Sequence, residues 1–122
     1  MRRLAASAPV CATITVLDGL VYARSAFESS MHYRSAVIFG AAVPVAAADK
    51  EQALRVLTDH LLPGRAPHLR APTVRELAAT SIVRLPLEEW SVKVSSAPPE
   101  DAADDLDAPL WAGVLPVRLA ST

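Results

Sequence analysis

The chain has 122 residues, 52% of them hydrophobic, and a formal net charge of −1. This length and composition predict one small folded domain over residues 1–122 and exclude a wholly disordered chain. Twelve Lys and Arg against thirteen Asp and Glu give no overall field that would draw the surface to nucleic acid or anionic lipid.

Cysteine usage and the apolar runs indicate the compartment. Cys11 is the only cysteine, so a disulfide framework and a cysteine metal cluster are excluded, and a cytoplasmic location is expected. No basic residue adjoins Cys11, which favours a buried packing role over a reactive one. The longest apolar run, residues 36–48, is too short for a membrane span.

The first elements have the period of β-strands. Residues 10–17 alternate, with Ile14 and Val16 on one face and Thr13 and Thr15 on the other. The Asp18-Gly19 pair predicts a two-residue hairpin turn, followed by a second strand over residues 20–27. A third, longer strand is predicted over residues 33–45.

Helical signals follow. Asp49 is placed to cap a helix over residues 50–62, which Pro63-Gly64 ends. Thr73 and Glu76 have the spacing of a capping box for a short second helix.

The last third of the chain returns to extended structure. Residues 80–95 predict a strand that kinks at Pro86, and residues 111–120 predict a closing strand. Between them, residues 96–109 predict an exposed, mobile acidic loop. From residue 85 onward the chain holds two basic and seven acidic residues, so this loop could cover a basic surface, although a solvated loop is favoured. The pattern as a whole is mainly β with helical insertions, as in an antiparallel barrel.

Few residues suggest chemistry. His32, His60 and His68 lack metal-ligand spacing, and the aspartates of the acidic loop do not follow a calcium pattern. The basic and hydroxyl residues of the strands are more informative: Arg can bind a phosphate through two hydrogen bonds, and an adjacent Ser can donate a third. These pairs are Arg24-Ser25 and Arg34-Ser35. By spacing alone, ordinary surface ion pairs are the favoured interpretation of both arginines.

Several segments, in the same order along almost the whole chain, resemble the pyridoxamine 5′-phosphate oxidase-related flavin-nucleotide-binding proteins, the branch that includes nitroimidazole-resistance proteins. They are Asp18–Phe27, Ser30–Ser35, Pro63–Arg65, Glu76–Thr80, Ser91–Lys93 and Trp111–Pro116. The resemblance implies an FMN-binding split β-barrel of antiparallel Greek-key type. It also implies a homodimer with the cofactor at the subunit interface, and no nucleic-acid or membrane partner.

The resemblance also implies site residues. Arg34 and Ser35 match the position where oxidases of this superfamily contact the flavin. Weaker candidates are Arg24, Ser25, Lys93, Ser91 and Trp111. His32 stands where relatives carry Asn, and Ser95 stands where many carry Arg, which removes one potential anion contact. His32 and Tyr33 are the only nearby titratable candidates for proton transfer.

Relatives begin with further residues that form a helix and the first barrel strands, so residues 1–122 resemble the C-terminal portion of a longer family domain. The expected function is FMN binding with flavin-dependent oxidoreductase activity. The alternative is a noncatalytic, dimerising module that holds no flavin. Deazaflavin or haem in the same cleft is a further possibility, and the substrate is not indicated.

Overall fold

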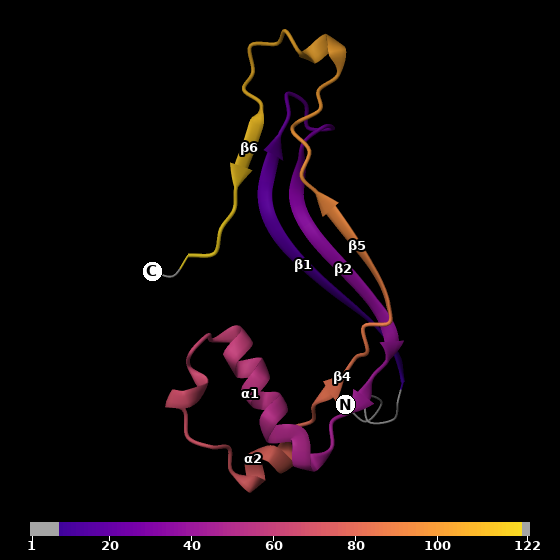
Figure 1. Ribbon diagram of the computed structural model, residues 1–122. Coiled ribbons are helices and arrows are strands. Elements are labelled where there is room, and N and C mark those ends of the chain that lie inside the picture. The colour runs from indigo at the N-terminus through magenta and orange to yellow at the C-terminus, as the bar shows by residue number, and fades with distance from the viewer. Residues whose placement is uncertain (1–7, 121–122) are drawn as a thin grey trace. The chain divides into compact units, whose positions relative to one another are not determined.

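The computed structural model describes residues 8–120, which form two compact units (Figure 1). The sheet unit contains residues 11–38 and 90–120, and the helical unit contains residues 8–10 and 39–89. All the site residues suggested by the sequence lie in the sheet unit.

The sheet unit is built on four strands. They are β1 (Pro9–Tyr22), β2 (Ser30–Ala41), β5 (Glu89–Ser95) and β6 (Gly113–Pro116). Their order in the sheet is β5-β2-β1-β6, and neighbouring arrows run in opposite directions in Figure 1. β6 pairs antiparallel with the end of β1, so that Leu20 faces Leu115. A mainly β, antiparallel fold is therefore confirmed, as is the closing strand. The strand predicted over residues 80–95 is interrupted around Pro86, because residues 83–84 and 89–95 form separate strands in different sheets.

The predicted hairpin turn at Asp18-Gly19 is wrong. β1 runs straight through both residues, and the chain turns in residues 23–29 instead. Gly19 is buried, and a Cβ there would lie 3.2 Å from both the Leu115 carbonyl oxygen and Val114 Cγ1. The glycine therefore permits the close approach of β6, and pairing with that distant strand outweighs the local turn signal.

Hydroxyl groups close the actual turn. Ser25 Oγ accepts a hydrogen bond from the Glu28 amide at 3.2 Å, and Ser29 Oγ donates to the Ser25 carbonyl at 2.9 Å. Ser29 Oγ also accepts from the Ala23 amide. Serines satisfy backbone groups in this way in irregular turns, which is why the seven-residue loop needs no glycine.

The two faces of the sheet differ in chemistry. Strand alternation places Thr15, Ser35, Tyr33, Lys93 and Ser91 together, and a Thr15–Ser35 hydrogen bond and the Lys93–Tyr33 contact agree with this placement. Leu17, Val21 and Val37 share this side by the same alternation, and we call it the hydroxyl face for its polar groups. The opposite, aliphatic face carries Ile14, Val16, Val92, Val94 and Leu115, together with Asp18 and Arg34.

The helical unit contains a two-stranded sheet and two α-helices. Strand β3 (Val43–Pro44) pairs antiparallel with β4 (Val83–Arg84). Helices α1 (Lys50–Leu61) and α2 (Val74–Ala79) lie between these strands in sequence, with 3₁₀ turns η1 (Ala47–Asp49) and η2 (Ala66–His68). A further turn, η3 (Ala103–Asp105), belongs to the sheet unit. Both predicted helices are confirmed.

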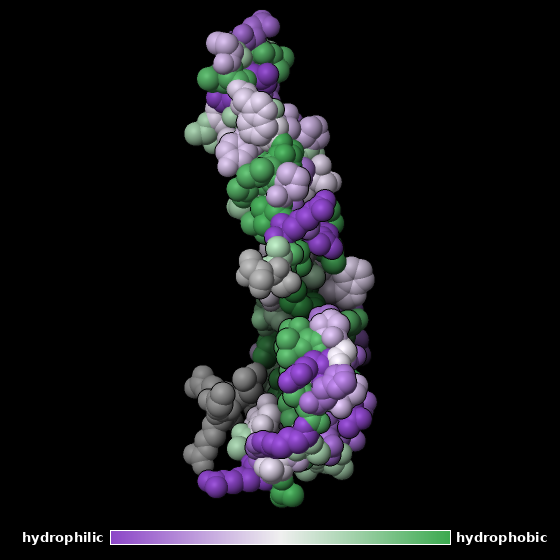
Figure 2. Space-filling model, turned by 90° about the vertical axis from the view of Figure 1, so that its left-hand side faces the viewer, coloured by the Kyte–Doolittle hydropathy of each residue, from purple (hydrophilic) through white to green (hydrophobic). Residues whose placement is uncertain are grey.

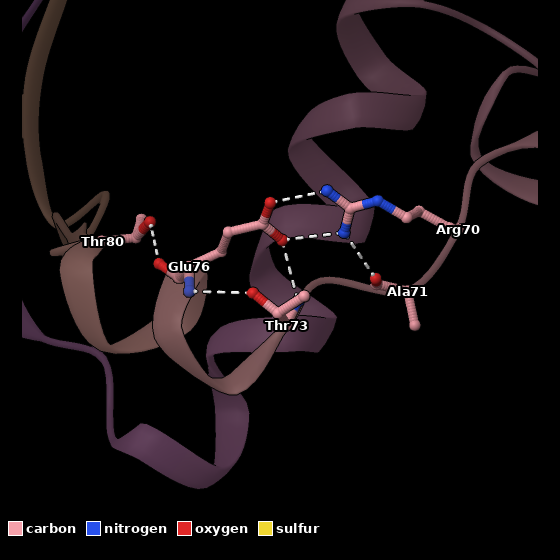
Figure 3. Close-up of polar contacts among 5 residues, drawn as sticks. All are labelled: Arg70, Ala71, Thr73, Glu76 and Thr80. Atoms are coloured by element: carbon pink, nitrogen blue, oxygen red, sulfur yellow. Dashed lines mark hydrogen bonds and ion pairs between the residues drawn. The ribbon is translucent and has the colours of Figure 1, made fainter.

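The two helices begin differently. Asp49 precedes α1 as predicted but makes no side-chain capping bond, because the preceding 3₁₀ turn gives it a helical backbone (φ −99°, ψ −7°) instead of the extended one that a cap needs. Thr73 and Glu76 form the predicted capping box at α2, with hydrogen bonds of 3.2 and 2.8 Å (Figure 3). Lys50 Nζ donates to the Leu77 carbonyl of α2 and so joins the helices.

Burial is sparse. Among residues 8–120 the buried apolar side chains are Val21, Ile38 and Ala42. On the aliphatic face Ile14 is 59% exposed and Val94 60% exposed. Figure 2 shows hydrophobic side chains at the surface among polar ones. Exposed apolar area of this extent is uncommon on the free surface of a monomeric domain.

Two observations concern the exposure of Cys11 and the length of the helices. Cys11, expected to be buried, is exposed, because it lies near the start of β1, where few side chains surround it. Within residues 8–120 no helix has the length and apolar character required to cross a membrane.

Candidate functional site

The candidate residues come from two strands and two loops of the sheet unit. Arg34 and Ser35 lie on β2, and Ser91 and Lys93 lie on β5. Arg24 and Ser25, expected on a strand, lie in the loop after β1 because β1 ends at Tyr22. Trp111 precedes β6.

Arg34 is held by a carboxylate. Its Nε and Nη2 donate to the two oxygens of Asp18, at 2.8 and 2.9 Å, in a planar two-bond pair across β1 and β2. Hydrogen bonding lowers the pKa of Asp18 and raises that of Arg34. Three of the five guanidinium N–H groups are not used in these two bonds.

Arg34 and its neighbour Ser35 point to opposite faces of the sheet, as adjacent strand residues must. Ser35 Oγ shares a hydrogen bond of 2.9 Å with Thr15 Oγ1 on the hydroxyl face. The two residues that the sequence paired therefore cannot approach the same ligand atom from the same side. This separation divides the expected site into two groups.

The hydroxyl face also carries a cation. Lys93 Nζ lies 5.7 Å from the centroid of the Tyr33 ring, within the range of a cation–π contact. Hydrogen bonding with Tyr33 raises the pKa of Lys93, so that its ammonium is charged at neutral pH. Lys93 forms no salt bridge within residues 8–120. It is therefore available to an incoming anion.

Arg24 anchors the acidic loop. Asp101 accepts from the Arg24 backbone amide and from Nη1, both at 2.6 Å, and its side chain is only 2% exposed. The hydrogen bond from the Arg24 backbone amide contributes most to lowering the pKa of Asp101. Arg24 Nε is buried with no acceptor in the described part of the chain. Asp101 thus fixes the acidic loop, residues 96–109, to the turn between β1 and β2.

Trp111 packs against the end of β1. Its ring lies 5.6 Å from that of Tyr22, centroid to centroid, at an interplanar angle of 52°. A Cβ on Gly113 would lie 2.5 Å from Trp111 Cζ2, closer than real atoms approach. Glycine at this position therefore makes room for the indole.

The available groups suit an anionic, hydrogen-bonding cofactor. Lys93 offers an ammonium without a carboxylate partner, and Ser35 and Ser91 offer hydroxyls on the same face. Cationic donors beside hydroxyls match the phosphate and the polar ring edges of a flavin nucleotide. No group of three or more potential metal ligands is present among the residues that the structure describes.

Sequence reasoning missed the two carboxylates that hold the arginines. Asp18 was assigned to a turn, and Asp101 was grouped with solvated loop acids. If β1 had been predicted to continue through residue 18, strand alternation would have placed Asp18 on the same sheet face as Arg34. The sequence analysis lacked the true length of this strand. Nothing local marks Asp101, whose partner lies 77 residues away.

Comparison with known proteins gave consistent matches. The family model described as pyridoxamine 5′-phosphate oxidase matches residues 1–94. The solved structure of the FAD and haem binding protein from Mycobacterium smegmatis is similar, with 46% identity and a TM-score of 0.83 over 95% of this chain and 58% of that one. The flavocytochrome Anf3 from Azotobacter vinelandii shares 37% identity, with a TM-score of 0.85 over 99% of this chain and 56% of that one.

The chain therefore spans somewhat over half the length of these two structures. A search of curated proteins gave no match. The similarity confirms the split-barrel flavoprotein fold expected from the sequence.

Proposed function

The chain belongs to the pyridoxamine 5′-phosphate oxidase family, and from this premise we propose that it binds a flavin and serves in flavin-dependent oxidation and reduction. The observation that carries the proposal is the 46% identity, over 95% of this chain, to a protein described as binding FAD and haem. The available cation and hydroxyls of the hydroxyl face support it independently.

We place the flavin contacts on the hydroxyl face. Lys93 would hold the flavin phosphate, and Ser35 and Ser91 would hydrogen-bond to its polar edges. These three share one side of the sheet, and Lys93 has no competing carboxylate among residues 8–120.

The other predicted contacts have a supporting role in this proposal. Arg34 is neutralised by Asp18, Arg24 is held by Asp101, and Ser25 accepts a backbone amide. Trp111 packs on Tyr22. Each of these interactions shapes a strand end or a loop around the sheet.

A bound flavin supplies the transfer of an electron pair, and the protein supplies position and electrostatics. Ser35 is oriented by its bond to Thr15, and Tyr33 keeps the Lys93 ammonium near the sheet. His32 is committed to a 2.7 Å contact between its Nε2 and the Ala97 carbonyl.

FMN is the flavin that we propose, since its one phosphate matches Lys93, the one cation on the hydroxyl face among residues 8–120. FAD is the alternative that the Mycobacterium smegmatis protein suggests. Haem is a second candidate ligand because both similar structures are described as haem or cytochrome proteins. Deazaflavin has no specific support.

We further propose a homodimer in the cytoplasm. The exposed side chains of the aliphatic face need cover, and a second copy supplies a matching apolar surface. A dimer that holds no flavin would correspond to the noncatalytic alternative.

Reconstitution tests the proposal. The purified chain is incubated with FMN, FAD or haem and passed over a gel-filtration column with light-scattering detection. We expect flavin absorbance to elute with a dimer. Elution of a dimer without flavin would support the noncatalytic module, and a chain that binds haem alone would overturn the flavin assignment.

A further inference from the structure

The helical unit contains a cavity that none of the proposed flavin contacts lines. It has a volume of about 250 Å³ and lies between α1 and the segment 66–72. Leu54, Arg55 and Thr58 line it from the helix, and Leu69, Arg70 and Pro72 line it from the segment. All of these residues belong to the same compact unit.

The outer wall of the cavity is held in place by polar contacts. Arg70 Nη2 and Nη1 donate to the two Glu76 carboxylate oxygens at 2.6 and 2.9 Å, and Nη1 also donates to the Ala71 carbonyl (Figure 3). Glu76 is fixed in turn by the capping box with Thr73. The cavity is therefore formed before any ligand arrives, which reduces the cost of binding.

The lining combines apolar and cationic groups. Leu54, Leu69 and Pro72 provide an apolar wall, which continues into a shallower depression that reaches Glu76. The guanidinium of Arg55 makes no hydrogen bond or salt bridge in the described part of the chain. Arg70 keeps two N–H groups that its three bonds do not use. Glu51 adds one negative charge at the margin.

Guanidinium groups bind carboxylates through paired hydrogen bonds, and the volume is below that of pockets for drug-sized ligands. We propose that this cavity binds a small organic carboxylate with a compact apolar body. The apolar body lies against Leu54 and Leu69, and the carboxylate is bound by Arg55 with help from Arg70. Glu51 weakens this binding by repulsion.

The inference is independent of the flavin proposal and is tested with a simple probe. The ¹⁵N-labelled full chain is titrated with 3-phenylpropionate and, separately, with uncharged 3-phenylpropanamide, and amide shifts are followed by NMR. We expect saturable shifts at residues 54–58 and 66–72 with the acid and much weaker shifts with the amide. Equal responses to acid and amide, or no saturation at millimolar concentrations, would overturn the proposal.

Three variants sharpen this test, and each changes an exposed helix position. Arg55→Gln is expected to weaken binding of the acid about tenfold, the effect of losing a charged hydrogen bond. Glu51→Gln is expected to strengthen it. Arg75→Gln, on α2 but outside the cavity lining, is the matched control and leaves the affinity unchanged. Wild-type affinity in Arg55→Gln contradicts the carboxylate assignment.

Discussion

Asp18 and Arg34 lie on adjacent strands and share two hydrogen bonds, of 2.8 and 2.9 Å, on the aliphatic face of the sheet. Ser35, the next residue, points to the other face and is bonded to Thr15. The arginine is therefore separated from the available cation and hydroxyls that we assign to the flavin.

The first prediction concerns this pair. Arg34→Gln and Asp18→Asn each leave FMN affinity within about twofold and lower the Tm by roughly 2 °C, since exposed ion pairs contribute little to stability. Flavin fluorescence and thermal unfolding measure the two effects. A tenfold loss of FMN affinity in Arg34→Gln, with the Tm unchanged, would make Arg34 a direct phosphate contact instead.

The second prediction concerns Glu76, whose pKa is lowered to about 2, first by hydrogen bonding to Arg70 and then by the Thr73 amide. A folded-state pKa below the ordinary value contributes stability above pH 4.5, and this contribution is lost as pH falls toward 2. NMR titration of the Glu76 carboxyl measures it directly. Arg70→Gln raises the pKa toward the ordinary value, whereas Arg75→Gln does not.

The third prediction concerns Asp101, whose carboxylate holds the loop by two bonds to Arg24. Asp101→Asn leaves a half-buried guanidinium without its counter-ion, with Nε already unpaired. We expect the Tm to fall by roughly 5 °C and residues 96–109 to be cleaved faster by protease. Asp104→Asn, at an exposed position in the same loop, is the control. Equal behaviour of the two variants would show that the anchor is not needed.

The fourth prediction concerns Gly113, which makes room for the Trp111 ring. Gly113→Ala displaces the indole from Tyr22 because the added methyl would lie 2.5 Å from Cζ2. Because Trp111 is already 68% exposed, the loss of the Trp111–Tyr22 contact is followed in a Trp90→Phe background by near-ultraviolet circular dichroism, whose aromatic signal should weaken. An unchanged spectrum would mean that the ring adjusts without leaving Tyr22.

Local signals predicted the helices and strands well. The Thr73–Glu76 capping box, the end of α1 near Gly64 and the interruption of extended structure at Pro86 depend on neighbouring residues and are all present. The Asp18-Gly19 turn failed because pairing with β6, almost one hundred residues later, decides the conformation there. A turn motif in one sequence does not reveal such a distant strand.

The candidate site was predicted less completely. Residue types and family resemblance suggested Ser35, Ser91 and Lys93, which strand alternation brings to one face. The same reasoning grouped Arg34 with Ser35, although adjacent strand residues face opposite sides. Whether a cation is available depends on partners such as Asp18 and Asp101, and those contacts arise from tertiary structure.

The most direct test of the account is a titration of FMN fluorescence with the full chain and with its Lys93→Gln variant. The wild-type chain is predicted to quench the flavin saturably. Lys93→Gln is predicted to bind about tenfold more weakly, because it loses a charged hydrogen bond to phosphate. Arg75→Gln, in the helical unit, should match the wild type. Absence of quenching by the wild-type chain, or equal affinity in Lys93→Gln, would contradict a flavin site on the hydroxyl face.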